Sequence, residues 1–276
     1  MLNKRISFFS FRIFMMPDIA TTVLLLFFGF GSGLFVGTAA GTAASFLIPG
    51  LTIVIGYSTH EAIGTSLAVD CIIGIVAGYT FIKNKYVNLK SAFLLVIAGI
   101  IGALIGSTFT AQAPEGSLNI AIGCFLLFIG YNFVRKGIKK NVDGVEKKIN
   151  FSFFRNHHLF SLLLLGGIIG GLSGFIGIGG SRMLSLILIF IMGYSLHQAV
   201  GTSLVMMIFI AGSGAINHGF QGEIVLPALL ILGISAAGGA YLGSHMANKI
   251  NEERLARIVG IIIFILGSII ILKNFF

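Results

Sequence analysis

Apolar residues in this chain form long runs separated by short polar stretches. Five runs lie in the first half, at about 19–38, 42–56, 61–82, 89–110 and 118–134. Five more lie in the second half, at about 159–178, 181–193, 196–217, 224–246 and 256–272. A helix needs about 20 residues to cross a bilayer, so most of these runs predict transmembrane helices. We expect an all-α polytopic membrane protein.

The second run of each half is too short to cross a bilayer comfortably on its own. Both short runs follow a glycine-rich stretch, which reads GLFVGTAAGTAASFLIPG at 33–50 and GLSGFIGIGGSRM at 171–183. In lipid, every backbone N–H and C=O group needs a protein partner. We therefore predict broken or re-entrant short helices at these two places, the second of them starting near Ser181.

The two halves repeat each other at an offset of 137 residues. Residues 56–67 read GYSTHEAIGTSL and residues 193–204 read GYSLHQAVGTSL, identical at nine of twelve positions. The same offset pairs GALIGS at 102–107 with GAYLGS at 239–244. Two copies of one unit are the simplest explanation. The predicted organisation is an N-terminal basic segment, a first repeat, a basic cytoplasmic linker and a second repeat, at residues 1–18, 19–135, 136–155 and 156–276.

Composition supports a membrane protein. Hydrophobic residues make up 56% of the chain and charged residues 10%, whereas a soluble domain carries about 25% charged residues. The net charge of +9 could suggest nucleic acid, but the basic residues lie in short loops between apolar runs. That distribution sets orientation in a lipid bilayer, so we expect no nucleic-acid partner. Residues 1–18 could form an interfacial amphipathic helix or a basic disordered start.

Loop charges predict that the two repeats are inverted. The 83–90 loop has three lysines and its equivalent at 220–227 has no basic residue. The 111–117 loop has none, whereas its equivalent at 247–257 has three. Positive loops face the cytoplasm, which places 83–90, 136–155 and 247–257 there. The basic residues near the N-terminus argue against this orientation, but the paired loops agree with one another.

Inverted repeats with interrupted helices are typical of secondary transporters, whose substrate site lies between the repeats. The chain has no nucleotide-binding loop, so we expect neither ATP-driven transport nor a cofactor. The second glycine-rich stretch would expose backbone N–H groups at the positive end of a helix, which favours an anion. The candidate residues of this stretch are Gly177, Gly179, Gly180, Ser181 and Arg182.

Arg182 is a functional candidate because an arginine in mid-membrane costs roughly 2.5–3.5 kcal/mol on insertion scales. Alternatively, its side chain reaches an interface from a short helix. Hydroxyl groups are the other candidate anion donors, and they can instead bond to carbonyls of their own helix. The hydroxyl candidates are Thr38, Thr42, Thr65, Ser66, Thr202 and Ser203. The four from the doubled G-T-S motif enter from the two halves and could converge at a pseudo-symmetric centre.

Three further polar residues lie inside or at the end of apolar runs. Asp70 follows Ser66 by one helical turn and could carry a coupling proton, hold Arg182, or be satisfied locally. Asn217 and His218 end a run and could line an exit or lie at the interface. His60 and His197 are repeat equivalents; inversion would place them on opposite sides of the membrane, so we expect no shared metal site.

These features resemble the sulfite exporter TauE/SafE family, which includes transporters of the 4-toluene sulfonate uptake permease type. The resemblance rests on the two glycine-rich breaks, the doubled A-x-G-T-S-L and the G-A-x-x-G-S motifs, and it covers the chain from about residue 25. It implies transport of a small sulfur-containing or carboxylate anion. The family pattern is G-x-G-G-G followed closely by proline. Here the second break has Ser181 and Arg182 with Leu186 in place of the proline, and the first keeps Pro49 but few glycines.

Two other functions remain open at this stage. Gly171-Leu172-Ser173-Gly174 has the form of a protease G-x-S-G string, for which His218 or His245 would be the base. The second alternative function is a passive anion channel. The sequence does not decide the substrate, the coupling ion, the direction of net flux or the oligomeric state.

Overall fold

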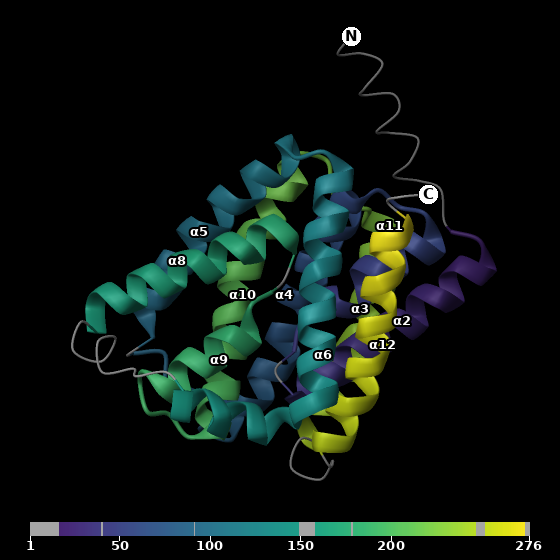
Figure 1. Cartoon of the computed structure of the whole chain (residues 1–276). Helices are drawn as coiled ribbons and strands as arrows, with labels where there is room; N and C mark the ends of the chain where they lie inside the picture. Colours follow the sequence, from purple (N-terminus) through teal and green to yellow (C-terminus); the bar gives the residue numbers. More distant parts are fainter. Residues whose placement is uncertain are drawn as a thin grey trace.

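A computed structural model describes residues 17–39, 41–90, 92–148, 158–177, 179–246 and 252–273. Within these ranges the secondary structure is helical, as the apolar runs predict (Figure 1). The elements are α2 (Ile19–Ala39), α3 (Ala44–Pro49), the π-helix η1 (Gly50–Ile55), α4 (Thr59–Lys83), α5 (Phe93–Gln112), α6 (Glu115–Lys148), α8 (His158–Ile176), α9 (Ser181–Phe190), α10 (Leu196–Phe220), α11 (Leu226–Met246) and α12 (Glu252–Lys273).

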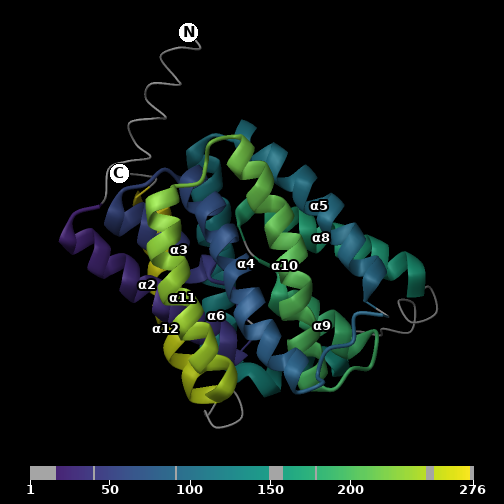
Figure 2. The same cartoon turned by 180° about the vertical axis from the view of Figure 1, so that it is seen from behind.

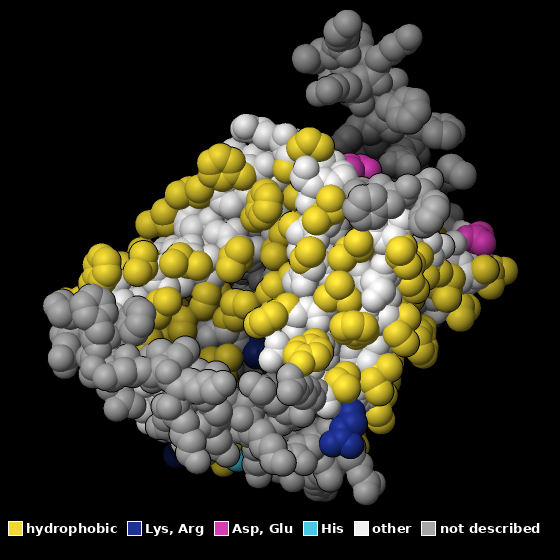
Figure 3. Space-filling model, viewed as in Figure 1, with side chains coloured by type: hydrophobic (Ala, Val, Ile, Leu, Met, Phe, Trp, Pro, Cys, Tyr) yellow, Lys and Arg dark blue, Asp and Glu magenta, His cyan; other side chains and the backbone are white. Residues whose placement is uncertain are grey.

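Six of these helices are long and apolar enough to cross a membrane, which confirms a multi-pass membrane protein. They are α2, α4, α5, α8, α10 and α11. Hydrophobic side chains cover much of the described surface (Figure 3), as lipid contact requires. Helix α6 continues to Lys148, well into the stretch predicted as a linker. The N-terminal segment up to residue 16 and residues 149–155 of the linker lie outside the described residues.

The two short apolar runs form interrupted helices, and α9 starts at Ser181 as predicted. In the first repeat, α3 turns into the π-helix η1 directly after Pro49. Proline has no N–H to give to the preceding turn, and a wider π turn is one way for the chain to continue. The second repeat has Leu186 at the equivalent position and keeps α-helical geometry over Ser181–Phe190.

Small residues join the first helix of each repeat to the fourth helix of the other. Figures 1 and 2 show α5 beside α8, and α2 packs in the same way on α11. A Cβ on three glycines of α2 and three of α8 would collide with the backbone of the partner helix, so the two backbones touch. The α2 pairs are Gly29–Leu232, Gly33–Ala236 and Gly37–Ala240; the α8 pairs are Gly166–Leu95, Gly170–Gly99 and Gly174–Ala103.

The α8–α5 contacts are the α2–α11 contacts shifted by 137 residues. In each helix pair, residue numbers increase along both helices in the same direction. Helices α2 and α11 therefore run parallel, as do α5 and α8. The packing agrees with the small-xxx-small pattern of membrane helices, in which glycine permits close approach and dispersion contact. Each repeat is held mainly by the other, because its outer helices pack across the repeat boundary.

Two pairs of equivalent helices lie next to each other and run antiparallel. Helix α4 packs on α10 at the centre of the bundle, and α6 packs on α12 (Figures 1 and 2). Gly123 meets Gly267 and Gly130 meets Gly260, so numbers rise along α6 as they fall along α12. Cys71 contacts the carbonyl of Ile208, its own repeat equivalent, at 3.5 Å.

The close glycine contact predicts a large difference between two neighbouring positions of α8. Gly170→Ala places a methyl group against the Gly99 carbonyl and should destabilise the protein by about 1–3 kcal/mol, as overpacking does. The matched control is Gly167→Ala, because a Cβ at Gly167 meets no atom within 4 Å. Unfolding of the purified protein in detergent measures both. Equal stability of the two variants would contradict the packing described here.

Candidate functional site

The two glycine-rich breaks cross each other beside the middle of α4. The Gly179 N–H donates to Thr42 Oγ1 at 3.1 Å, and the Ser181 hydroxyl donates to the Gly41 carbonyl. Thr42 and Gly179 are repeat equivalents, so each break contacts its own counterpart at this point. The crossing therefore supplies partners to backbone groups that have none within a helix.

Asp70 fixes the crossing from the centre of α4. Its side chain is fully buried; Oδ2 accepts the Thr42 hydroxyl at 2.9 Å and Oδ1 accepts the Ala43 N–H at 2.8 Å. Two donors thus stabilise the carboxylate in an apolar bundle. Among the described residues, no ion pair joins Asp70 to Arg182. The structure therefore places Asp70 at the crossing of the two breaks, as a locally bonded group.

Glycine is required at three positions of the second break, for two different physical reasons. Gly177 and Gly180 have φ of 74° and 75°, a left-handed conformation that side chains disfavour. A Cβ at Gly179 would collide with the Asp70 carboxylate. At Gly177 it would lie 3.2 Å from Ser66 Oγ, so this part of the break lies against the middle of α4.

Arg182 lies on the first turn of α9 and its side chain is partly buried. The preceding residue, Ser181, is the one bonded to Gly41, so Arg182 directly follows the crossing. Its repeat equivalent, Ser45, is 2% exposed and lines a small pocket between α3, α6 and the end of α8. The pocket is otherwise apolar; its lining residues are Ala44, Ser45, Ile48, Ile122, Phe125, Leu126 and Ile176.

The doubled G-T-S motif joins each central helix to a loop of the other repeat. Thr202 Oγ1 accepts the Asn88 N–H at 3.1 Å, and Thr65 Oγ1 accepts the Val225 N–H at 3.1 Å. These two bonds are equivalents at the 137-residue offset. Because α4 and α10 run antiparallel, they lie at opposite ends of the pair. Thr65 and Thr202 therefore do not converge on one centre.

Three other predicted hydroxyls donate to carbonyls of their own helices, which was the alternative to a role in anion binding. Ser66 donates to Ile63 O and Ser203 donates to Val200 O, each at 2.9 Å. Thr38 bonds back to carbonyls of α2, with Leu34 O and Phe35 O at 3.0 Å. Thr42 is thus the hydroxyl of the predicted set that the structure brings to the crossing together with Gly179 and Ser181.

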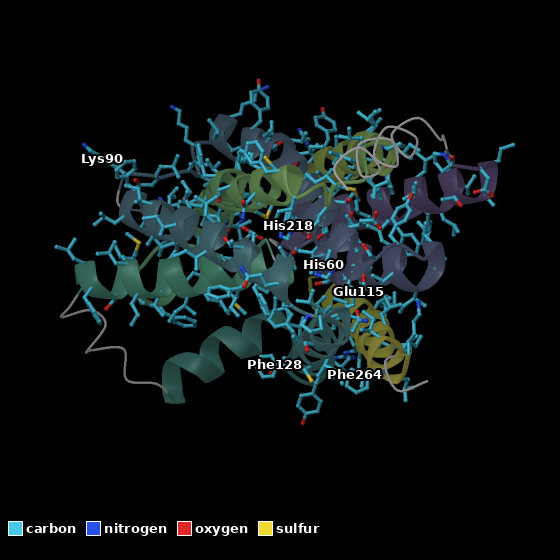
Figure 4. All side chains as sticks on the ribbon, turned by 90° about the horizontal axis from the view of Figure 1, so that it is seen from above. His60, Lys90, Glu115, Phe128, His218 and Phe264 are labelled. Atoms are coloured by element: carbon cyan, nitrogen blue, oxygen red, sulfur yellow. The ribbon has the colours of Figure 1, made fainter. Side chains whose placement is uncertain are left out.

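The end of α10 carries a polar cluster. Asn217 donates to Ser107 Oγ at 2.7 Å. His218 is fully buried, with Nε2 at 3.1 Å from Gly174 O and Nδ1 at 2.5 Å from Glu223 Oε2. His60, at the start of α4, lies 3.1 Å from the Thr110 carbonyl. Both histidines are labelled in Figure 4, and Thr110 connects them, because its carbonyl contacts His60 and its hydroxyl donates to the Gly174 carbonyl that His218 contacts.

This cluster contains a residue that the sequence did not single out. Glu223 lies in the loop between α10 and α11 and contacts His218. The available signal was that Glu223 is a carboxylate in a short loop between two apolar runs, where the first repeat has an aromatic residue, Tyr86.

The hydroxyl of Ser173 lacks the neighbouring base that a serine protease needs. Its Oγ is buried without a hydrogen-bond partner. Both ring nitrogens of His218 are directed at Gly174 and Glu223, and His245 Nδ1 lies 2.8 Å from Tyr241 O. A serine nucleophile needs a base within hydrogen-bond reach, and neither histidine meets that requirement.

The model of the family described as "Sulfite exporter TauE/SafE" matches residues 25–270. The chain belongs to this family. TauE/SafE proteins are membrane transporters and not enzymes, so the protease alternative is excluded. The resemblance read from the glycine-rich breaks and the doubled A-x-G-T-S-L is therefore confirmed.

Three relatives, each named a probable membrane transporter protein, match 78–90% of the chain. "Probable membrane transporter protein YunE" of Bacillus subtilis is 24% identical over 223 residues, which cover 78% of this chain and 82% of that protein. "Probable membrane transporter protein YdhB" of the same organism is 24% identical, covering 82% and 90%. "Probable membrane transporter protein MJ0441" of Methanocaldococcus jannaschii is 25% identical, covering 90% and 95%. No solved structure matches the chain.

The loop bond of the first G-T-S motif makes a direct prediction. Thr65→Val keeps the shape of the side chain but leaves the Val225 N–H without its acceptor. An unpaired buried donor costs about 1–3 kcal/mol, so the variant should unfold more readily. Thr65→Ser keeps an oxygen there and should lose much less. Thermal unfolding in detergent compares them, and a valine variant as stable as the serine variant would refute the role assigned to Thr65.

Proposed function

We propose that this TauE/SafE protein is a secondary carrier for small anions that works by alternating access between two inverted repeats. The observation that carries the proposal is the crossing of the two breaks at Asp70. It brings the starts of two interrupted helices together inside the bundle, where such transporters bind their substrates. Transport by a membrane protein is already the family's activity; the anion, the site and the mechanism are what is proposed.

The inversion is supported by helix directions and by loop charge. The central equivalents α4 and α10 run antiparallel, and so do α6 and α12. Helices α4 and α11 run parallel, because Gly233 meets Ile72 and Ser244 bonds to Thr80. In the sequence, the basic loop at 83–90 follows α4 and the basic stretch at 247–257 follows α11. The ends of α4 and α11 thus lie at one end of the bundle, and the lysines and arginines that follow both in the sequence assign that end to the cytoplasm by positive-inside bias.

The choice of an anion rests on the start of α9. The positive end of the helix dipole favours a negative ligand there, and Arg182 adds a full positive charge on the first turn. The family description makes sulfite, sulfonates and thiosulfate the first ligands to test, followed by small carboxylates.

Removal of the Arg182 charge tests the anion site. Arg182→Gln should weaken anion binding by more than tenfold, or about 1.4 kcal/mol, whereas Arg182→Lys keeps the charge and should retain more affinity. A thermal-shift screen against sulfite, sulfate, thiosulfate, sulfonates and carboxylates finds the ligand, because a ligand stabilises the state that it binds. Equal affinity of the wild type and Arg182→Gln would remove Arg182 from the site.

Transport assays in liposomes separate a carrier from a passive channel. A carrier should show saturable uptake that is stimulated by unlabelled substrate on the opposite side. Uptake that stays linear with concentration and shows no such counterflow would favour the channel.

Labelling of single cysteines tests the inverted arrangement. Cysteines placed at Lys85 and at Gln221, in the loops after α4 and α10, should react from opposite sides of the membrane in oriented vesicles. The antiparallel directions of α4 and α10 require this outcome. Reaction of both cysteines from the same side would rule out inverted repeats.

A further inference from the structure

The two ends of the central α4–α10 pair are built alike but carry different chemistry. At each end, the G-T-S glycine packs against the last turn of the opposing helix and the loop that follows it, and the threonine accepts an N–H of that loop. Gly201 meets Phe81 and the Tyr86 carbonyl; Gly64 meets His218 and the Glu223 carbonyl. We call the first contact the aromatic latch and the second the His–Glu latch.

The residue pairs that distinguish the latches occupy equivalent positions. Phe81 and Tyr86 contact each other with ring centroids 6.5 Å apart. At an offset of 137, the same two positions hold His218 and Glu223, joined at 2.5 Å. The repeat has kept the loop bond at both ends, through Thr202 and Thr65. It has replaced an aromatic contact at one end with two titratable groups at the other.

The geometry of the His–Glu latch requires a shared proton. Nε2 of His218 faces the Gly174 carbonyl at 3.1 Å, which can only accept, so Nε2 carries a hydrogen. Nδ1 lies 2.5 Å from Glu223 Oε2. An ionised carboxylate accepts only, and so does an unprotonated Nδ1. The contact therefore forms when one proton lies between them, as imidazolium with carboxylate or as imidazole with carboxylic acid.

Loss of that proton would set two acceptors against each other at a buried site. His218 is fully buried, and the Glu223 side chain is 15% exposed, so water can compensate this repulsion only poorly. The loop can relieve the repulsion by moving away, which would break the bond from the Val225 N–H to Thr65. Proton release and opening of the latch are therefore coupled, in both directions.

The neighbouring titratable groups do not supply the missing proton. On α4, Glu61 bonds to Ser58, and His60 directs Nε2 at the carbonyls of Thr110 and Ala113. Glu115, at the start of α6, lies 3.8 Å from His60 Nδ1. From α8, the Gly174 carbonyl contacts His218, and the Thr110 hydroxyl of α5 donates to that same carbonyl at 3.2 Å.

We propose that His218 and Glu223 form a proton-binding site, at which one bound proton holds the loop between α10 and α11 closed on α4. On the alternating-access mechanism proposed above, this site would open one end of the carrier when its proton leaves, while the aromatic latch closes the other end without a proton. The proton site itself does not depend on transport, since it follows from the contacts of His218.

Hydrogen–deuterium exchange of the full-length protein, without substrate, tests the proposal. Exchange of the 221–226 loop is measured from about pH 5 to about pH 8, where imidazole titrates, and is divided by the intrinsic exchange rate at each pH. Protection of this loop should fall by about tenfold or more as pH rises. The equivalent 84–89 loop, which carries the Asn88–Thr202 bond, should keep its protection. His197→Phe removes the histidine that stacks on Tyr86 at 5.2 Å and controls for any residual change there.

Two variants make the test specific. Glu223→Gln can donate from its amide to an unprotonated Nδ1, so the loop should stay protected over the whole pH range. His218→Phe combined with Glu223→Tyr copies the pair of the first repeat and should also remove the pH dependence. If wild-type protection does not change with pH, or if Glu223→Gln keeps the wild-type pH dependence, the proposal is wrong. A failure of anion binding or transport with this pH dependence intact would overturn the proposed function alone.

Discussion

Backbone hydrogen bonding in the absence of water is the constraint on which the rest of this structure depends. A helix satisfies its own N–H and C=O groups, but two breaks inside the membrane cannot. Here the breaks satisfy each other: Gly179 donates to Thr42, Ser181 donates to Gly41, and the Ala43 N–H is bonded to Asp70. An irregular backbone is therefore possible only where both repeats are present. The site and the joining of the repeats have the same physical cause.

Close packing explains why the repeats interlock. Lipid tails are as apolar as the helices, so helices associate through contact between backbones and through hydrogen bonds. The glycines of α2 and α8 let these helices touch α11 and α5 of the other repeat. The G-T-S motifs work in the same way at the centre, where glycine makes room for a loop and threonine accepts its N–H. Much of the glycine in this chain has a packing role. Gly177 and Gly180 of the second break are instead needed for their positive φ, as are Gly56, Gly193 and Gly222 where other helices end.

Several features could be predicted from the sequence because they are local or repeated. Apolar runs predict the helices, and the glycine cluster places the start of α9 at Ser181. The helix partners could not be predicted, because an offset of 137 residues identifies equivalents without giving the axis that relates them. For the same reason, Thr65 and Thr202 were expected to converge, whereas an antiparallel α4–α10 pair separates them. The π turn after Pro49 and the role of Glu223 depend on three-dimensional neighbours that no spacing reveals.

The positions at which the two repeats differ are the strongest guide to function. Residues that both copies retain, such as the G-T-S motifs, make equivalent bonds in both and are explained by architecture. A duplicated unit with identical ends would have no energetic preference between its two exchanged conformations. Substitutions that break the repeat supply that preference: Asp70 against Met207 and Arg182 against Ser45 near the crossing, and His218 against Phe81 at the ends. In each case one repeat has an ionisable group where the other has an uncharged residue, and an unpaired charge is costly in a membrane. In the alternating-access mechanism proposed above, these few asymmetric positions would set the balance between the two conformations and its response to ions, whereas the shared residues would make both conformations possible.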